Sequence, residues 1–238
     1  MAHTSLRGLR IAITGGTSGL GLALVKRLVE VGADVAFIAR GRSGVERVGQ
    51  QYPDARGIVG DVSKKDEIHP IAIQVLGALG GLDVLVNNAS SLGPVPLALL
   101  ADTECEDLER AFATNVLGPF RLTRALLGSL AATARAGGVP LVVNISSDAA
   151  VTPYAGWGAY GASKAALAHL SRIWDAELAA EGIHVVSIDP GDMDTPLHEL
   201  AVPDADRSSL KSPHQAAAEI IELIVARAAR TPEPEATR

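Results

Sequence analysis

Tyr160 and Lys164 stand four residues apart and are the side chains in this sequence best placed to do chemistry. In a helix, positions i and i+4 lie one above the other on one face, close enough for the ammonium to stabilise a phenolate. The phenol of a free tyrosine has a pKa of about 10, and a fixed neighbouring cation lowers it. Such a pair would make Tyr160 a proton donor for carbonyl chemistry.

Taken alone, a Tyr and a Lys at this spacing more often form a solvated helix face. Of the three tyrosines, Tyr52, Tyr154 and Tyr160, only Tyr160 is followed by a lysine four residues later. A dinucleotide-binding signature near the N-terminus independently supports the interpretation of Tyr160 as a proton donor.

That signature is the glycine-rich turn TGGTSGLG at residues 14–21, which follows a short apolar run and precedes a helix-periodic segment. Its glycines permit a tight turn, close approach of the backbone to a pyrophosphate, and close packing of helix on strand. The helix N-terminus attracts the phosphate charge. The predicted cofactor contacts in this turn are Gly15, Thr17, Ser18, Gly19, Leu20 and Gly21.

Short apolar runs alternate with helix-periodic segments along the whole chain. Strands are expected at 9–14, 34–39, 56–60, 82–86, 140–145 and 184–188, and helices near 19–31, 43–50, 64–79, 104–133, 157–181 and 214–229. Strands that are apolar on both sides imply a parallel sheet covered on two faces. The predicted fold class is therefore α/β: a doubly wound Rossmann fold, a three-layer αβα sandwich on six parallel strands, with seven as the alternative.

The composition fits one globular domain of 238 residues, 47% of them hydrophobic. A single domain is predicted over 1–230, with a disordered tail at 231–238. The net charge of −6 and the lack of a basic run argue against nucleic acid as a partner. No membrane span or signal peptide is recognised, and the lone Cys105 forms no internal disulfide, so a cytoplasmic protein without a membrane partner is expected. No metal site is predicted.

Seven separated features occur in the order that one known family shows. They are TGxxxGxG at 14–21, Asp61-Val62, Asn87-Asn88-Ala89, Asn115, Ser147, the YxxxK pair at 160 and 164, and Pro190-Gly191 with Thr195. Over almost its whole length the chain resembles the short-chain dehydrogenases/reductases of the compact, single-domain type. The resemblance implies an oxidoreductase that transfers hydride between a nicotinamide and a carbonyl or secondary alcohol.

The resemblance implies catalytic roles for four residues, Asn115, Ser147, Tyr160 and Lys164. Ser147 would hydrogen-bond the substrate carbonyl, with Ser146 less favoured, and Tyr160 would protonate the oxygen as hydride arrives at carbon. Lys164 would hold the nicotinamide ribose and lower the tyrosine pKa. Asn115 would hold a water that relays protons from Lys164 to solvent. Without the resemblance, Ser147 would be interpreted as a loop serine and Asn115 as a cap or kink.

Other matched positions are implied to bind the cofactor. Asp61 and Val62 would contact the adenine, and Asn88 and Ala89 would line the adenosine and ribose. The nicotinamide end would be held by Pro190, Gly191, Thr195 and the backbone of Met193.

The end of the second predicted strand decides between NAD and NADP. An acidic residue there would bind the ribose 2′-hydroxyl of NAD, whereas a cation would attract the 2′-phosphate of NADP. The chain has Ala39 at the expected acidic position, followed by Arg40 and Arg42. NADP(H) is therefore predicted, with Arg40 as the main phosphate contact and Arg42 as a second; NAD(H) is the less favoured cofactor.

Substrate contacts are expected from residues near Tyr160 and from the polar loop at 192–212, since long loops often close over a binding site. The candidates are Tyr154, Trp157, Met193, Leu197, His198, Leu200, Leu92 and Gly93. A partly aromatic, apolar pocket predicts a small hydrophobic ketone or aldehyde. Core or surface packing accounts equally well for any single one of these residues.

The chain departs from the family pattern after its last predicted helix. Compact members continue into a seventh strand that helps to build a tetramer, whereas residues 231–234 here are Thr-Pro-Glu-Pro. This departure, and the lack of a basic cluster for an acidic carrier, argue against an acyl-carrier-protein ketoreductase. The resemblance favours a homodimer through the helices near 104–133 and 157–181, with a tetramer as the alternative.

Several functions stay open at this point. An NADP(H)-dependent carbonyl reductase or alcohol dehydrogenase uses all four catalytic positions, and an NAD-dependent alcohol dehydrogenase is a variant of it. A sugar-nucleotide epimerase or dehydratase shares the Tyr-Lys pair but needs a larger C-terminal substrate domain. A catalytically silent regulator would bind NADP(H) and act through a partner.

Overall fold

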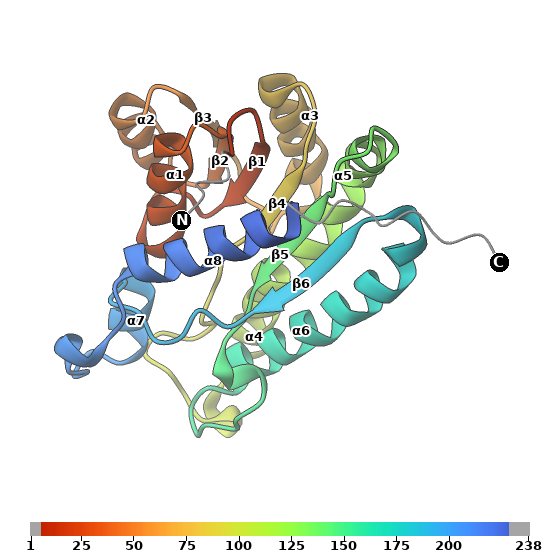
Figure 1. Cartoon of the computed structure of the whole chain (residues 1–238). Helices are drawn as coiled ribbons and strands as arrows, with labels where there is room; N and C mark the ends of the chain where they lie inside the picture. Colours follow the sequence, from red (N-terminus) through yellow and green to blue (C-terminus); the bar gives the residue numbers. More distant parts are fainter. Residues whose placement is uncertain (1–5, 229–238) are drawn as a thin grey trace.

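The computed structural model describes residues 6–228 and has a doubly wound α/β architecture (Figure 1). In this part of the chain six parallel strands form one sheet in the order β3-β2-β1-β4-β5-β6. They are β1 Arg10–Thr14, β2 Asp34–Ala39, β3 Ala55–Val59, β4 Val84–Asn87, β5 Leu141–Ile145 and β6 His184–Ile188. The predicted fold class is confirmed, and each strand lies within two residues of its predicted position. The predicted tail at 231–238 lies outside the described residues.

Helices cover both faces of the sheet (Figure 1). One face is covered by α1 (Gly19–Glu30), α2 (Arg42–Gln51) and α8 (Pro213–Ala228), and the other by α3 (Ile68–Leu79), α5 (Gly118–Arg135) and α6 (Gly158–Leu178). Successive strand residues point to opposite faces, so Ile11 and Ile13 join the first core and Ala12 the second. Burial on both faces is why the strands are almost continuously apolar.

The predicted helix at 104–133 is one helical course with a defect in its middle. α4 (Cys105–Phe112) runs into a π-helical turn at Ala113–Leu117, and α5 continues from Gly118. Short 3₁₀ turns occur at Lys65–Glu67, Leu100–Asp102, Asp148–Ala150, Ala179–Glu181 and Arg207–Ser209. A π turn within a helix often marks a functional site.

The segment at 192–212 is more ordered than the sequence suggested. It contains the short helix α7 (Pro196–Ala201) and a bridge between Met193 and Lys211. Thr195 caps α7, its Oγ1 accepting a hydrogen bond from the His198 N–H at 3.2 Å. The prediction of an irregular loop was therefore wrong here, because an N-cap threonine followed by Pro196 is a helix start signal.

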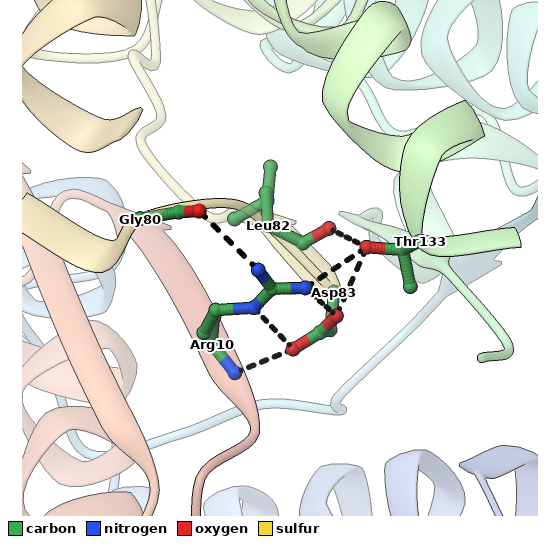
Figure 2. A network of polar contacts seen from close by, with 5 residues as sticks. All are labelled: Arg10, Gly80, Leu82, Asp83 and Thr133. Atoms are coloured by element: carbon green, nitrogen blue, oxygen red, sulfur yellow. Dashed lines mark hydrogen bonds and ion pairs between the residues drawn. The ribbon is translucent and has the colours of Figure 1, made fainter. Parts of the chain in front are cut away.

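A polar network ties β1, β4 and α5 together at the amino ends of the strands (Figure 2). Arg10 donates to Asp83 from Nε at 2.9 Å and from Nη2 at 2.6 Å. Thr133 Oγ1 lies 2.8 Å from the Leu82 carbonyl oxygen and 3.0 Å from Asp83 Oδ1. Burial alone would raise the pKa of Asp83, but the hydrogen bonds from Arg10 and Thr133 and the Arg10 charge outweigh it and hold that pKa below its usual range. The network anchors the sheet at the end opposite to the site described next.

Candidate active site

The carboxyl ends of the strands open into a cavity of about 600 Å³. Its walls come from the turn after β1, the segments after β2, β3, β4, β5 and β6, and α7. The strand order reverses between β1 and β4, and open α/β sheets bind ligands at such a point. The volume is in the range usual for small-molecule sites.

The glycine turn after β1 adopts a conformation that requires glycine. Gly15 and Gly19 have φ angles of +72° and +50°. A Cβ on Gly21 would stand 2.2 Å from the carbonyl oxygen of Gly15. The side chain of Asn88, just after β4, ties the turn in place, since its Nδ2 donates to the Thr14 carbonyl at 2.8 Å.

The turn fits the pyrophosphate of a dinucleotide. Ser18 is the N-cap of α1 but makes no side-chain capping bond, so N–H groups of the first helical turn remain for a ligand. The absence of Cβ atoms at Gly15 and Gly19 lets a ligand approach the backbone closely. Together the positive end of the helix and the bare backbone suit a phosphate group.

Most predicted cofactor residues lie on the cavity wall. These are Gly15, Thr17, Ser18, Gly19, Leu20, Arg40, Asp61, Val62, Asn88, Ala89, Pro190, Gly191, Met193 and Thr195. Gly21 lies inside the turn rather than on the wall, and Arg42 is an exposed residue at the start of α2 that does not line the cavity. Of the two predicted phosphate contacts, Arg40 therefore lines the cavity and Arg42 does not.

Arg47 was not predicted, although it contacts the glycine turn. Its Nη2 donates to the Thr17 carbonyl at 3.2 Å from the second turn of α2. The arginine stands on an exposed helix face in a segment of weak periodicity, and no sequence motif marks it.

The structure also brings the catalytic candidates together at this cavity. Ser147, Tyr160 and Lys164 line its wall, and Tyr160 and Lys164 are buried in α6, with 7% and 2% of their surface exposed. Lys164 Nζ donates to the Ile145 carbonyl at 2.7 Å and lies 5.4 Å from the centroid of the Tyr160 ring. Ser146 also lines the wall.

The electrostatics of the pair differ from the prediction. Burial raises the pKa of Tyr160 to about 12, while the hydroxyls of Ser147 and Ser90 act in the opposite direction. Burial also lowers the pKa of Lys164 to about 8. The predicted lowering of the tyrosine pKa by Lys164 is not present in this structure, because the ammonium lies by the ring and bonds to a strand carbonyl.

Asn115 lies in the π turn, fully buried and away from the cavity wall. Its Nδ2 donates to the Ser91 carbonyl and to Ser163 Oγ, each at 2.8 Å, and its Oδ1 accepts from the Ser91 N–H at 2.8 Å. The side chain thus joins the segment after β4 to α6. A proton relay through Asn115 stays a prediction.

Six of the eight substrate candidates also line the cavity. They are Tyr154, Trp157, Met193, Leu197, His198 and Leu92, whereas Gly93 and Leu200 do not line it. Sequence reasoning missed five polar wall residues, Ser90, Thr114, Asp148, Asp189 and Asp192. All but Thr114 share one signal, a position shortly after β4, β5 or β6, where parallel strands deliver ligand contacts.

Comparison with known proteins agrees with this geometry. The sequence pattern of the short chain dehydrogenases matches residues 10–206. The chain belongs to this family of oxidoreductases. It is 32% identical over 239 residues to an uncharacterized oxidoreductase of Mycobacterium tuberculosis, covering 98% of this chain and 68% of the relative. It is 31% identical over 212 residues to a glucose 1-dehydrogenase of Gluconobacter oxydans, covering 87% and 77%.

Two solved structures resemble the fold closely. A 3-ketoacyl-(acyl-carrier-protein) reductase from Brucella melitensis, complexed with NADH, superposes with a TM-score of 0.85 at 29% identity over 92% of this chain and 91% of the other. A short chain dehydrogenase from Burkholderia cenocepacia, in complex with NADP, gives a TM-score of 0.82 at 27% identity over 93% and 92%.

No helix in residues 6–228 has the length and apolar character that a membrane crossing needs.

Proposed function

We propose that the protein is an NADP(H)-dependent carbonyl reductase, or in reverse an alcohol dehydrogenase, acting on a small substrate with an apolar body. The observation that carries this proposal is the position of Tyr160, Lys164 and Ser147 on the wall of the cavity that holds the glycine turn. A silent regulator would have no use for a buried Tyr-Lys pair facing the same space.

The cofactor would lie along the cavity from the glycine turn to the segment after β6. Gly15 and Gly19 would admit the pyrophosphate, Asp61 and Val62 would contact the adenine, and Pro190, Gly191, Met193 and Thr195 would hold the nicotinamide. When bound there, the cofactor supplies the hydride.

Tyr160 would donate the proton. With a pKa of about 12, its hydroxyl is protonated at neutral pH, which is the form that can protonate a carbonyl oxygen. Ser147 Oγ lies 3.0 Å from Asp148 Oδ1, and rotation of its hydroxyl toward the substrate would orient the carbonyl. Lys164, held by its hydrogen bond to the Ile145 carbonyl, would bind the ribose hydroxyls of the cofactor.

The preference for NADP(H) rests on the segment after β2. Arg40 lines the cavity, and position 39 is an alanine rather than an acidic residue. Arg47 donates a hydrogen bond to the carbonyl of Thr17 in the glycine turn. None of the ion pairs among the described residues involves either arginine. Two cations without a carboxylate partner favour a 2′-phosphate at this end of the cavity.

The direct test is consumption of NADPH with a broad panel of aldehydes and ketones. The proposal predicts carbonyl-dependent loss of NADPH absorbance, faster than with NADH at equal concentration. Tight binding of NADPH with no turnover across the panel would instead favour the regulator.

We also propose a homodimer through α4, α5 and α6. Leu108 and Ile173 on α4 and α6, and Leu117 in the π turn, are large apolar side chains with 37% to 41% of their surface exposed. Covering such side chains is a common reason for association. Light scattering would test the proposal by giving the mass of two chains rather than one or four.

A further inference from the structure

Asp148 connects the catalytic serine to the aromatic wall of the cavity. It is the first residue of the 3₁₀ turn after β5 and lines the cavity. Its Oδ1 accepts a hydrogen bond from Ser147 Oγ at 3.0 Å, and its Oδ2 accepts one from the Tyr154 hydroxyl at 2.6 Å. A carboxylate thus stands one hydrogen bond away from the group that would orient the substrate.

This carboxylate is ionised and has no cationic partner. The hydrogen bond from Tyr154 holds the pKa of Asp148 below its usual range. Asp189 and Asp192 line the same cavity, and within residues 6–228 no Lys, Arg or His forms an ion pair with any of the three aspartates. The nearby lysines are engaged elsewhere, since Lys164 bonds to a strand carbonyl and Lys211 pairs with Glu219.

Aromatic rings complete the surroundings of Asp148. Tyr154 and Trp157 pack edge to face with ring centroids 6.4 Å apart, and Trp157 and Tyr160 do so at 5.7 Å. All three rings line the cavity. Aromatic faces attract cations electrostatically, and a carboxylate beside them adds its own charge.

We infer that the part of the cavity lined by Asp148, Tyr154 and Trp157 selects carbonyl substrates that carry a protonated amine, and that Asp148 binds the ammonium. The inference rests on the proposed reductase function and names its substrate class. Met193 and Leu197 on the same wall would contact the apolar substituents of the amine. The carboxylates of Asp148, Asp189 and Asp192 on the cavity wall disfavour an anionic substrate.

The distances limit how far the amine stands from the carbonyl. A carbonyl oxygen hydrogen-bonded to Ser147 Oγ would lie about 2.8 Å from it, and an ammonium would lie at a similar distance from Asp148. Because Asp148 Oδ1 is itself 3.0 Å from Ser147 Oγ, one to three carbon atoms between carbonyl and nitrogen would let both groups bind together.

Three ketones test the inference on the complete enzyme with NADPH. Dimethylaminoacetone is cationic at neutral pH, methyl isobutyl ketone has the same skeleton with carbon in place of nitrogen, and levulinate is an anion. We expect kcat/KM for the amine to exceed that for the neutral isostere by about tenfold, with levulinate lowest.

Asp148→Asn should reduce the ratio of kcat/KM for the amine to that for the isostere by about tenfold, whereas Asp148→Glu should keep most of this ratio. Asp54→Asn, an exposed carboxylate outside the cavity, is the matched control and should leave the ratio unchanged.

Binding without turnover gives an independent readout. In calorimetry on enzyme loaded with oxidised NADP, the amine should bind about tenfold more tightly than the isostere, and Asp148→Asn should remove the difference. Equal kcat/KM for amine and isostere, or a ratio unchanged in Asp148→Asn, overturns the inference while leaving the reductase proposal standing. If no carbonyl of the broad panel is reduced, the reductase proposal fails, and the calorimetric comparison alone decides whether the cavity selects an ammonium.

Discussion

Lys164 Nζ donates a 2.7 Å hydrogen bond to the carbonyl oxygen of Ile145, the last residue of β5. This bond fixes a buried ammonium at the carboxyl end of the sheet, 5.4 Å from the centre of the Tyr160 ring. The tyrosine keeps its proton at neutral pH, because burial raises its pKa to about 12. The site therefore holds Tyr160 in the form that can donate a proton.

Reduction and oxidation should respond differently to pH. Reduction uses the protonated form of Tyr160, which dominates at neutral pH, so its kcat/KM should fall only in alkali, first as Lys164 loses its proton near pH 8 and then as the Tyr160 hydroxyl ionises. Alcohol oxidation uses the phenolate. At pH values below the pKa, the phenolate fraction grows about tenfold for each unit by which the pH rises. Initial rates in both directions across neutral and alkaline buffers check this. An oxidation rate that is already constant at neutral pH would contradict it.

Replacing Arg40 should alter the choice of cofactor. Arg40→Asp removes a cation from the cavity wall and adds a charge that repels a 2′-phosphate. The Kd for NADPH should rise by about 10- to 100-fold, and that for NADH should change little or fall. Fluorescence titration with each cofactor measures both values.

Arg42→Asp is the matched control, because Arg42 lies two residues away but does not line the cavity. Its effect on the Kd for NADPH should be several-fold smaller than that of Arg40→Asp. Equal effects of the two substitutions would show that the assignment of the phosphate contact is wrong.

A methyl group at Gly21 should prevent cofactor binding. The new Cβ would stand 2.2 Å from the Gly15 carbonyl oxygen and 2.6 Å from Asn88 Nδ2, so the turn would have to move. Gly77→Ala is the control, because no atom lies within 4 Å of the Cβ position in that helix, and it should raise stability by about 0.5–1 kcal/mol. Titration with NADPH and thermal unfolding of both variants check the pair. Normal NADPH affinity in Gly21→Ala would refute the predicted clash.

The network in Figure 2 should stabilise the fold above acidic pH. The pKa of Asp83 is lower in the folded chain than the unfolded value of about 3.9, so its contribution is complete above that value and is lost as pH falls through the folded pKa. Asp83→Asn should lower the free energy of unfolding by about 2 kcal/mol at neutral pH, and by progressively less in acid. Denaturant unfolding across this pH range measures both. A pH-independent difference between variant and wild type would count against the ionic part of the account.

The fold could be predicted because its strands are buried on both faces. Runs such as Ile11–Ile13 and Val84–Val86 are apolar at every position, whichever face of the sheet each side chain points to. Gly15, Gly19 and Gly21 mark the turn that only glycine can form. Helix α7 was not predicted, because its capping signal at Thr195 and Pro196 lies in a polar segment that was interpreted as a loop.

The details of the site depend on how deeply each side chain is buried and where it points, which the spacing of residues in the sequence does not specify. The pattern Tyr160-x-x-x-Lys164 predicts two side chains on one face of a helix, but burial and the nearby Ile145 carbonyl decide where the ammonium goes. Arg40 and Arg42 look alike in the sequence, yet only Arg40 lines the cavity. Asp148 follows Ser147 directly but belongs to no motif, and only the fold brings the Tyr154 hydroxyl to its carboxylate.

The central claim is that Tyr160 transfers a proton while NADPH is consumed, and Tyr160→Phe tests it most directly. The substitution removes one hydroxyl and keeps the ring that packs against Trp157. With the best carbonyl of the panel, turnover of bound NADPH should fall by at least about 10²-fold, while the Kd for NADPH stays within about threefold of wild type. Turnover within a few-fold of wild type, at full occupancy by NADPH, would contradict the account.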